Sequence, residues 1–148
     1  MNHTTLKNWN ILIIDENPYD IAALEELFAA SPYHLCLARS CEEAKQVIEV
    51  FGFPHLIVTE KTFSNGMDGF EFSRLIRANS DIPIIVYSER IPTKLIVKAI
   101  DEFADDYIIK PVRPEMLLSH IRRVLRRIDF LPGALQSFSS HFVANYSA

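Results

Sequence analysis

Three small groups of residues carry side chains that could act on a phosphoryl group. They are the adjacent acids Asp15 and Glu16, the hydroxyl of Ser88, and Lys110, which precedes Pro111. Carboxylate pairs bind hard cations such as Mg²⁺, whereas a hydroxyl and an ammonium can hold phosphoryl oxygens. Together these side chains have the chemistry of a divalent cation beside a phosphoryl group.

Each group also has a simpler interpretation. The two acids can form an acidic turn, Ser88 can cap a loop, and Lys110 can be a solvated lysine. An ammonium that leaves a buried strand needs a counter-charge, however, because an unpaired charge there is costly. The Lys110-Pro111 bond is a candidate cis peptide bond that would aim the ammonium into a crevice. Each group follows an apolar run, and the carboxyl ends of parallel strands share one crevice, which favours the joint interpretation.

Five short apolar runs have the composition of buried strands, over residues 9–14, 33–38, 55–59, 82–87 and 107–109. Helix signals alternate with them: an Asn17-Pro18 start, a capping box from Ser40 to Glu43, an Asp68-Gly69 start, and amphipathic patterns over 92–103 and 114–128. Nearly continuous apolar strands separated by amphipathic helices predict parallel strands with both sheet faces covered. The expected fold is a doubly wound, three-layer sandwich.

Helical spacing of apolar residues predicts which helix positions face the sheet. The predicted buried positions are Ile21, Leu24, Phe28, Phe72, Leu75, Ile76, Leu95, Ile96, Ala99, Ile100, Phe103, Leu117, Ile121, Val124, Leu125 and Ile128.

The composition restricts the class of protein. The chain has 148 residues, 49% apolar and 23% charged, with a net charge of -4, which predicts one soluble domain and argues against nonspecific nucleic-acid binding. Its apolar runs are too short to cross a membrane, and no secretory signal is visible at the N-terminus. We therefore expect Cys36 and Cys41 to be reduced thiols in the cytoplasm.

Three segments make the chain resemble the receiver domains of two-component response regulators: Ile11–Asn17, Gly66–Glu71 and Ala104–Pro111. Their order and spacing match that family. The resemblance covers residues 9–128 and leaves residues 129–148 as a C-terminal extension or the start of a truncated region. It implies a flavodoxin-like α/β fold, a doubly wound (βα)5 sandwich around a five-stranded parallel sheet of order 2-1-3-4-5.

The resemblance also implies roles for individual residues. Asp15 and Glu16 match the acidic pair that binds Mg²⁺, Ser88 the hydroxyl residue that contacts the phosphoryl group, and Lys110 the lysine that pairs with it. Tyr107 matches the aromatic residue whose rotamer reports activation. The implied partners are a histidine kinase or phosphotransfer protein, a downstream effector protein, or both.

The chain departs from the family at the phospho-acceptor position. Receivers have an aspartate after the third strand, where this chain has Glu60 followed by Lys61. Counting back from Gly69 by the common spacing reaches Lys61, whereas matching the strand reaches Glu60 with one extra loop residue. We prefer Glu60, because a lysine there would repel both Mg²⁺ and Lys110.

Glutamate carries the same carboxylate as aspartate on a longer stem, so Glu60 could reach Lys110 and Ser88 without phosphorylation. We therefore expect a receiver that acts by protein–protein contact and is not phosphorylated. Two alternatives stay open. The domain could bind Mg²⁺ through Asp15, Glu16 and Glu60 and be phosphorylated on Glu60 or elsewhere, or it could serve only as a scaffold.

Opposite charges within residues 92–128 suggest a two-fold homodimer. The charged residues are Asp101, Glu102, Asp105, Asp106, Arg113, Arg122, Arg123, Arg126 and Arg127. Local ion pairs on solvated helices are the alternative. No helix-turn-helix pattern follows, so we expect no direct DNA binding.

A flavodoxin-like enzyme or cofactor-binding module is the rival hypothesis from another class. A flavin site would need a hydroxyl- and glycine-rich loop after the first strand, where this chain has Asp15-Glu16-Asn17-Pro18. Neither a Gly-x-Ser-x-Gly elbow nor a Walker loop is present. The sequence thus predicts a signalling domain without enzymatic activity or an organic cofactor.

Overall fold

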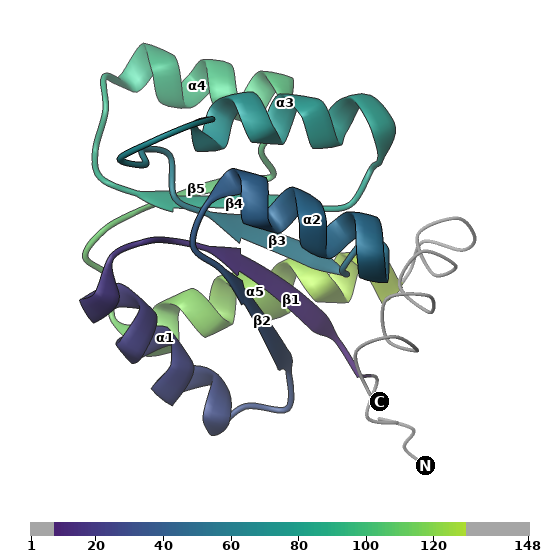
Figure 1. Cartoon of the computed structure of the whole chain (residues 1–148). Helices are drawn as coiled ribbons and strands as arrows, with labels where there is room; N and C mark the ends of the chain where they lie inside the picture. Colours follow the sequence, from purple (N-terminus) through teal and green to yellow (C-terminus); the bar gives the residue numbers. More distant parts are fainter. Residues whose placement is uncertain (1–7, 130–148) are drawn as a thin grey trace.

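The computed structural model describes residues 8–129, in which five strands alternate with five helices (Figure 1). The strands are β1 (Asn10–Ile14), β2 (His34–Ala38), β3 (Leu56–Thr59), β4 (Ile84–Ser88) and β5 (Asp106–Ile109). The helices are α1 (Pro18–Ala29), α2 (Cys41–Phe51), α3 (Gly69–Asn79), α4 (Thr93–Glu102) and α5 (Pro114–Asp129). Every predicted element is present, with bounds that differ by one or two residues. Apart from Asp129, the predicted extension over residues 129–148 lies outside the described residues.

The strands form one parallel sheet of order β2-β1-β3-β4-β5, which confirms the predicted fold. Strands β1 and β3 lie in the middle of the sheet, and all of their residues are buried. Strand β2 is an edge strand and is partly exposed. The chain reverses direction across the sheet between β1 and β3, so a crevice opens at the carboxyl ends of these strands.

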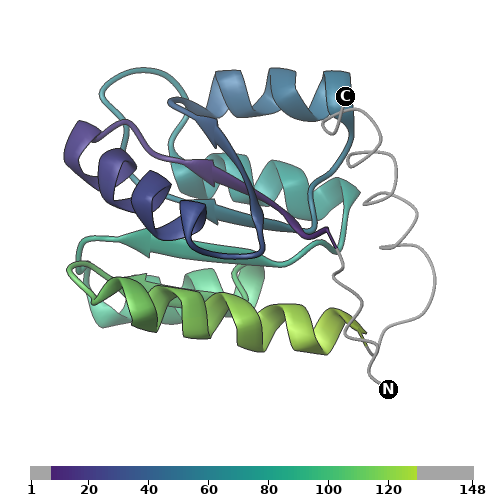
Figure 2. The same cartoon turned by 90° about the horizontal axis from the view of Figure 1, so that it is seen from below.

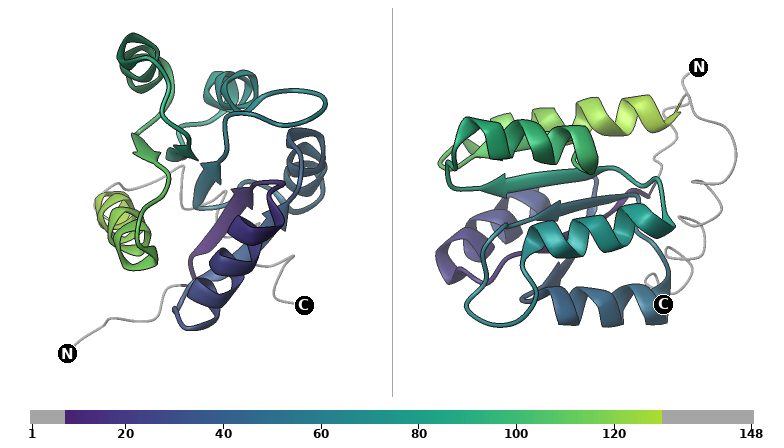
Figure 3. Two further views of the ribbon diagram at one scale, coloured as in Figure 1. Left: turned by 90° about the vertical axis from the view of Figure 1, so that its left-hand side faces the viewer. Right: turned by 90° about the horizontal axis from the view of Figure 1, so that it is seen from above.

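The helices form a layer on each face of the sheet. Helices α1 and α5 cover one face, and α2, α3 and α4 cover the other (Figures 1 and 2). Side chains alternate along β1: Ile11 and Ile13 pack under α1 and α5, whereas Leu12 and Ile14 pack under α2 and α3. Figure 3 shows the same layers from two further sides. Both faces of the sheet are therefore covered by helices, as the nearly continuous apolar strands predict.

Side-chain caps begin three of the helices as the sequence predicts. The side chains of Asn17, Ser40 and Asp68 accept backbone N–H groups from the first turns of α1, α2 and α3, respectively. The reciprocal bond of the capping box is shifted, because the Glu43 carboxylate accepts the N–H of Arg39 at 3.3 Å.

The start of α3 also lies close to the end of β3. The N–H of Gly69 donates to the carbonyl oxygen of Lys61 at 2.7 Å. A Cβ atom on Gly69 would lie only 1.9 Å from the carbonyl oxygen of Glu60, so this position requires glycine.

Three of the predicted core positions are wrong. Leu75, Leu95 and Ile100 expose 37%, 41% and 45% of their surface, respectively. Helix α4 covers β5, the edge strand, so its contact stripe is narrow and of its own residues only Ala99 is fully buried. Helical spacing marks the apolar side of a helix but not the width of the sheet beneath it.

Both cysteines are buried, and Cys41 is a free thiol, as predicted. Burial raises the pKa of the Cys41 thiol to about 12, so the reactive thiolate is disfavoured. None of the helices within residues 8–129 combines the length and the apolar composition needed to cross a membrane.

Candidate functional site

Four strands each deliver one of the predicted site residues to the same edge of the sheet. Asp15 follows β1, Glu60 follows β3, Ser88 ends β4 and Lys110 follows β5. Backbone hydrogen bonds continue the ladder past the strand ends. The N–H of Glu60 donates to the carbonyl of Ile14 at 2.9 Å, and that of Lys110 donates to the carbonyl of Ser88 at 2.8 Å. The sheet itself therefore fixes how these side chains lie relative to one another.

Lys110 lies at the centre of the site, with 8% of its side chain exposed. Its Nζ donates to Asp15 Oδ2 at 2.9 Å, to Asp20 Oδ2 at 2.8 Å and to Glu60 Oε1 at 2.9 Å. The peptide bond between Lys110 and Pro111 is cis, as predicted. We call Lys110 with its three acids the carboxylate–lysine cluster.

Burial and ion pairing oppose each other in this cluster. Burial alone would lower the pKa of Lys110, but its hydrogen bonds to Asp20, Asp15 and Glu60 outweigh burial and raise the pKa above its ordinary value. For Asp15 burial is the larger effect and raises its pKa, although hydrogen bonds from Lys110 and the Asn17 N–H act against it. The ammonium has three partners, so it stays charged at neutral pH.

The Glu60 carboxylate uses both of its oxygens. Oε1 accepts from Lys110, and Oε2 accepts a short hydrogen bond from the Ser88 hydroxyl. Oε2 also accepts the backbone N–H groups of Lys61 at 2.6 Å and of Thr62 at 3.4 Å. The Lys61 ammonium lies elsewhere, 4.9 Å from the centre of the Phe70 ring. The side chain that enters the crevice is thus that of residue 60.

Glu16, the third predicted Mg²⁺ ligand, lines the same cavity as Asp15 and Glu60, but its hydrogen bonds are to the loop after β3. Its oxygens accept the backbone N–H of Ser64 at 3.0 and 3.1 Å and a short bond from the Ser64 hydroxyl, which lower the pKa of Glu16. Within residues 8–129, no three acids, histidines or cysteines are arranged to hold a metal ion. Asp15 and Glu60 are hydrogen-bonded to Lys110 in this arrangement, and an Mg²⁺ site formed by Asp15, Glu16 and Glu60 stays a prediction.

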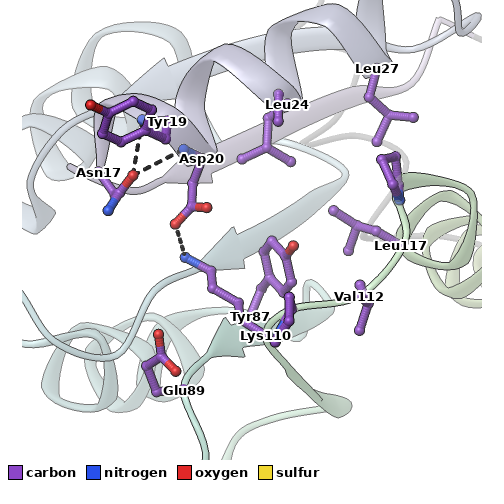
Figure 4. Close-up of a pocket in the computed structure, with 13 residues that line it drawn as sticks. Asn17, Tyr19, Asp20, Leu24, Leu27, Tyr87, Glu89, Lys110, Val112 and Leu117 are labelled. Atoms are coloured by element: carbon purple, nitrogen blue, oxygen red, sulfur yellow. Dashed lines mark hydrogen bonds and ion pairs between the residues drawn. The ribbon is translucent and has the colours of Figure 1, made fainter.

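Asp20 was not among the predicted site residues. This residue lies in the first turn of α1, and its carboxylate accepts from Lys110 at 2.8 Å (Figure 4). The Asn17-Pro18 start was the available signal, because it places the first turn of α1 directly after β1 and thus beside the crevice. An acid in that turn lies within reach of a cation at the strand ends.

Tyr107 lies beside the cluster on β5. Its hydroxyl donates to the carbonyl oxygen of Glu89 at 2.7 Å, and its ring is buried against Phe70 with 6.5 Å between the ring centres. Burial raises the pKa of Tyr107. The ring is therefore held inward, next to Ser88.

Residues 11–122 match the response regulator receiver domain family. This chain belongs to that family. The receiver is 30% identical over 117 residues to the two-component response regulator ORR23 of Oryza sativa subsp. indica, and this match covers 79% of the receiver chain and 17% of ORR23. It is 36% identical over 74 residues to the DNA-binding response regulator MtrA of Mycobacterium tuberculosis, covering 50% of this chain and 32% of MtrA. The match thus spans less than a third of each of these relatives.

Solved structures agree with this assignment. A two-component response regulator from Clostridium difficile is 30% identical, with a TM-score of 0.73, and the match covers 82% of the receiver and 98% of that chain. A CheY-like receiver domain protein from Methanospirillum hungatei is 23% identical, with a TM-score of 0.74 over 82% of the receiver and 96% of that chain, and supports the fold. Receiver domains are regulatory rather than catalytic modules, and they interact with kinases or phosphotransfer proteins and with effectors.

Proposed function

We propose that this receiver signals through protein–protein contacts without the usual aspartyl phosphate, because Glu60 occupies the acceptor position. The observation that carries the proposal is that one Glu60 carboxylate contacts both Lys110 and Ser88. These are the two side chains that, by resemblance to other receivers, would hold a phosphoryl group. The carboxylate therefore places negative charge where phosphorylation would place it, with fewer oxygens and less charge.

The surroundings of Tyr107 support the same proposal. The Ser88 hydroxyl points to Glu60, and the Tyr107 ring is buried beside it with its hydroxyl bound to the Glu89 carbonyl. By resemblance, these two residues form the switch of a receiver. A permanent carboxylate partner for Ser88 would bias that switch toward its active-like state.

Chemical phosphorylation tests the proposal. We expect that acetyl phosphate or phosphoramidate with Mg²⁺ leaves the wild type unmodified and adds one phosphoryl group to Glu60→Asp, as measured by intact mass. Shortening the side chain opens space for the phosphorus and restores the usual nucleophile. Lys61→Asp is the matched control, since it places an aspartate one residue further on, and it should gain nothing. Stable labelling of wild-type Glu60 would instead support a receiver that is still phosphorylated.

We further propose that a second copy of the receiver can bind through residues 92–128, where Leu95, Val97 and Ile100 are exposed on α4. Internal ion pairs weaken the charge argument for this dimer, because Asp106 already binds His120 at 2.7 Å and Arg123 at 3.0 Å. Sedimentation over a concentration series at low and high salt measures the association. A monomer at every concentration would reject the dimer.

The proposed partners are a histidine kinase or phosphotransfer protein and a downstream effector protein, and the proposed location is the cytoplasm. Cys41 is a buried free thiol, which supports this location because cysteines stay reduced there. We propose no catalytic activity for the domain.

A further inference from the structure

A second cleft lies next to the carboxylate–lysine cluster, between α1 and the segment that joins β5 to α5 (Figure 4). Its volume is about 380 Å³, within the range of sites that bind small organic molecules. Lys110 and Asp20 line this cleft, whereas Asp15, Glu16 and Glu60 do not. The cleft thus adjoins the cavity around the acceptor position, and Asn17, Asp20 and Glu89 line both.

One end of the cleft is apolar. Leu24 and Leu27 line it from α1, and Val112 and Leu117 line it from the opposite side. The Tyr87 ring stands between these walls, and its hydroxyl points into the space in Figure 4. Among the described residues, this hydroxyl has no hydrogen-bond partner. An apolar group that entered the cleft would contact both walls and leave a donor or acceptor within reach of the Tyr87 hydroxyl.

The other end of the cleft carries excess negative charge. Asp20 and Glu89 line it, together with Asn17 and Lys110. Three carboxylates already surround the Lys110 ammonium, so with Glu89 the acids outnumber this cation four to one. Asp20 keeps 35% of its side chain exposed and binds Lys110 through one oxygen. This end would attract a small cation and repel an anion.

We propose that the cleft binds a small organic amine with an aromatic or branched apolar body. The body would lie against Leu27, Tyr87 and Val112, and the ammonium would bind between Asp20 and Glu89. The apolar body would then contact the apolar end of the cleft, and the positive ammonium would contact its negatively charged end.

Binding there would also act on the receiver switch, a consequence that rests on the function proposed above. Asp20 is one of three carboxylates on Lys110, and an ammonium bound to its other oxygen would weaken the attraction between Asp20 and Lys110. Lys110 would then depend more on Asp15 and Glu60. An amine could thus change the Glu60 contacts without phosphorylation, and by linkage those contacts would change amine affinity by the same factor.

Amide NMR titration of the full chain tests the binding site. The probes are 2-phenylethylamine, its neutral analogue 2-phenylethanol and its anionic analogue phenylacetate. We expect the amine to shift signals in residues 17–27 and 110–117 with a dissociation constant on the order of 1 mM, as is usual for so small a ligand. The alcohol should bind several-fold more weakly, and phenylacetate more than tenfold more weakly. Equal binding of all three probes, or shifts elsewhere, would overturn the proposal.

Two alanines on α1 provide matched variants. Both are exposed, but Ala23 lines the cleft and Ala22 does not. Ala23→Trp should fill the cleft and abolish the amine-dependent shifts, whereas Ala22→Trp should leave them unchanged. Glu89→Gln should weaken binding of the amine several-fold without affecting that of the alcohol. Unchanged amine binding in Ala23→Trp would reject the site.

The outcome does not depend on the chemistry at the acceptor position. Glu60 does not line the cleft, so Glu60→Asp should still bind the amine and shift signals in residues 17–27 and 110–117, with an affinity that differs from that of the wild type only by the coupling factor. Failure of the amine to bind would reject the cleft proposal alone. Phosphorylation of the wild type would instead reject the proposed function.

Discussion

The Glu60 carboxylate lies 2.9 Å from the Lys110 ammonium, although fifty residues separate them in the chain. The contact forms because β3 and β5 end at the same edge of a parallel sheet and both side chains turn into one crevice. The same lysine binds Asp15 and Asp20, so the chain supplies its own cation to a group of acids that would otherwise repel one another. This pairing of one ammonium with three carboxylates leads to four of the expectations below.

Removing that cation should destabilise the fold. Lys110→Met keeps an unbranched apolar side chain but removes the ammonium, which lies 4.9 Å from the centre of the Tyr87 ring, and leaves Asp15, Asp20 and Glu60 facing one another. We expect a loss of roughly 3 kcal/mol in the free energy of unfolding, measured by urea titration at neutral pH. Lys98→Met is the control, because Lys98 is an exposed lysine with one partner at 3.8 Å, and its effect should stay within about 0.5 kcal/mol.

The same variant should respond to Mg²⁺. With the ammonium gone, Asp15 and Glu60 are free to bind a divalent cation, and millimolar Mg²⁺ should restore part of the lost stability by binding the folded state. In the wild type, Lys110 already occupies these carboxylates, so we expect little change. The measurement is the thermal midpoint with and without Mg²⁺. An equal rise in both proteins would contradict the expectation.

Ser88→Ala should cost about 1 kcal/mol in the free energy of unfolding. The Ser88 hydroxyl is buried and donates to a carboxylate, whereas Glu60 keeps its bonds from Lys110 and two backbone N–H groups. Ser119→Ala is a suitable comparison, since Ser119 is exposed and its change should stay within about 0.5 kcal/mol. Equal effects of the two changes on the urea midpoint would argue against a strong Ser88 bond.

Asp15 should give a characteristic pH dependence. Its buried carboxyl has a pKa raised above the ordinary 3.8, so the folded state binds this proton more readily than the unfolded state. The contribution of Asp15 to stability therefore falls as the pH rises from its ordinary pKa through its pKa in the folded state. Asp15→Asn should flatten the curve of urea midpoint against pH between about 4 and 7. Parallel curves for the two proteins would show that this carboxyl does not contribute.

Two apolar residues of α3 test the packing against the sheet. Phe72 is fully buried, and Phe72→Ala should cost about 3–5 kcal/mol through lost contacts and the cavity left behind. Leu75 is 37% exposed, so Leu75→Ala should cost about 1 kcal/mol or less. The ratio of the two losses in the free energy of unfolding, measured by urea titration, checks that the side of α3 that carries Phe72 packs against the sheet. Similar losses would place Leu75 in the core.

The strand ends could be predicted from the sequence because apolar runs of this length must be buried and parallel strands end on one edge. The contact between Lys110 and Glu60 could therefore be predicted from the strands alone, without the conformation of any loop. Asp20 could not, since its reach depends on how α1 packs against the sheet. Glu16 turns to Ser64 because the loop after β3 is long enough to pass over the crevice, and nothing in local sequence specifies that path.

The errors in the predicted core have a related cause. Leu95 and Ile100 follow the helical spacing of buried residues, yet α4 lies over an edge strand that covers only part of its apolar side. The spacing of apolar residues shows which side of a helix is apolar, whereas their burial depends on the area of sheet that this side packs against. Helix α5 has the same pattern over a broader surface, and there every predicted position is buried.

The absence of a side chain at Gly69 has a mechanical consequence. The first turn of α3 sits so close to the backbone of residue 60 that neither can shift alone. Displacement of the β3 tip, whether by a ligand, a mutation or a modification, would push the whole helix sideways. A partner protein bound to α3 would then be affected by a structural change in the crevice without contacting the crevice itself.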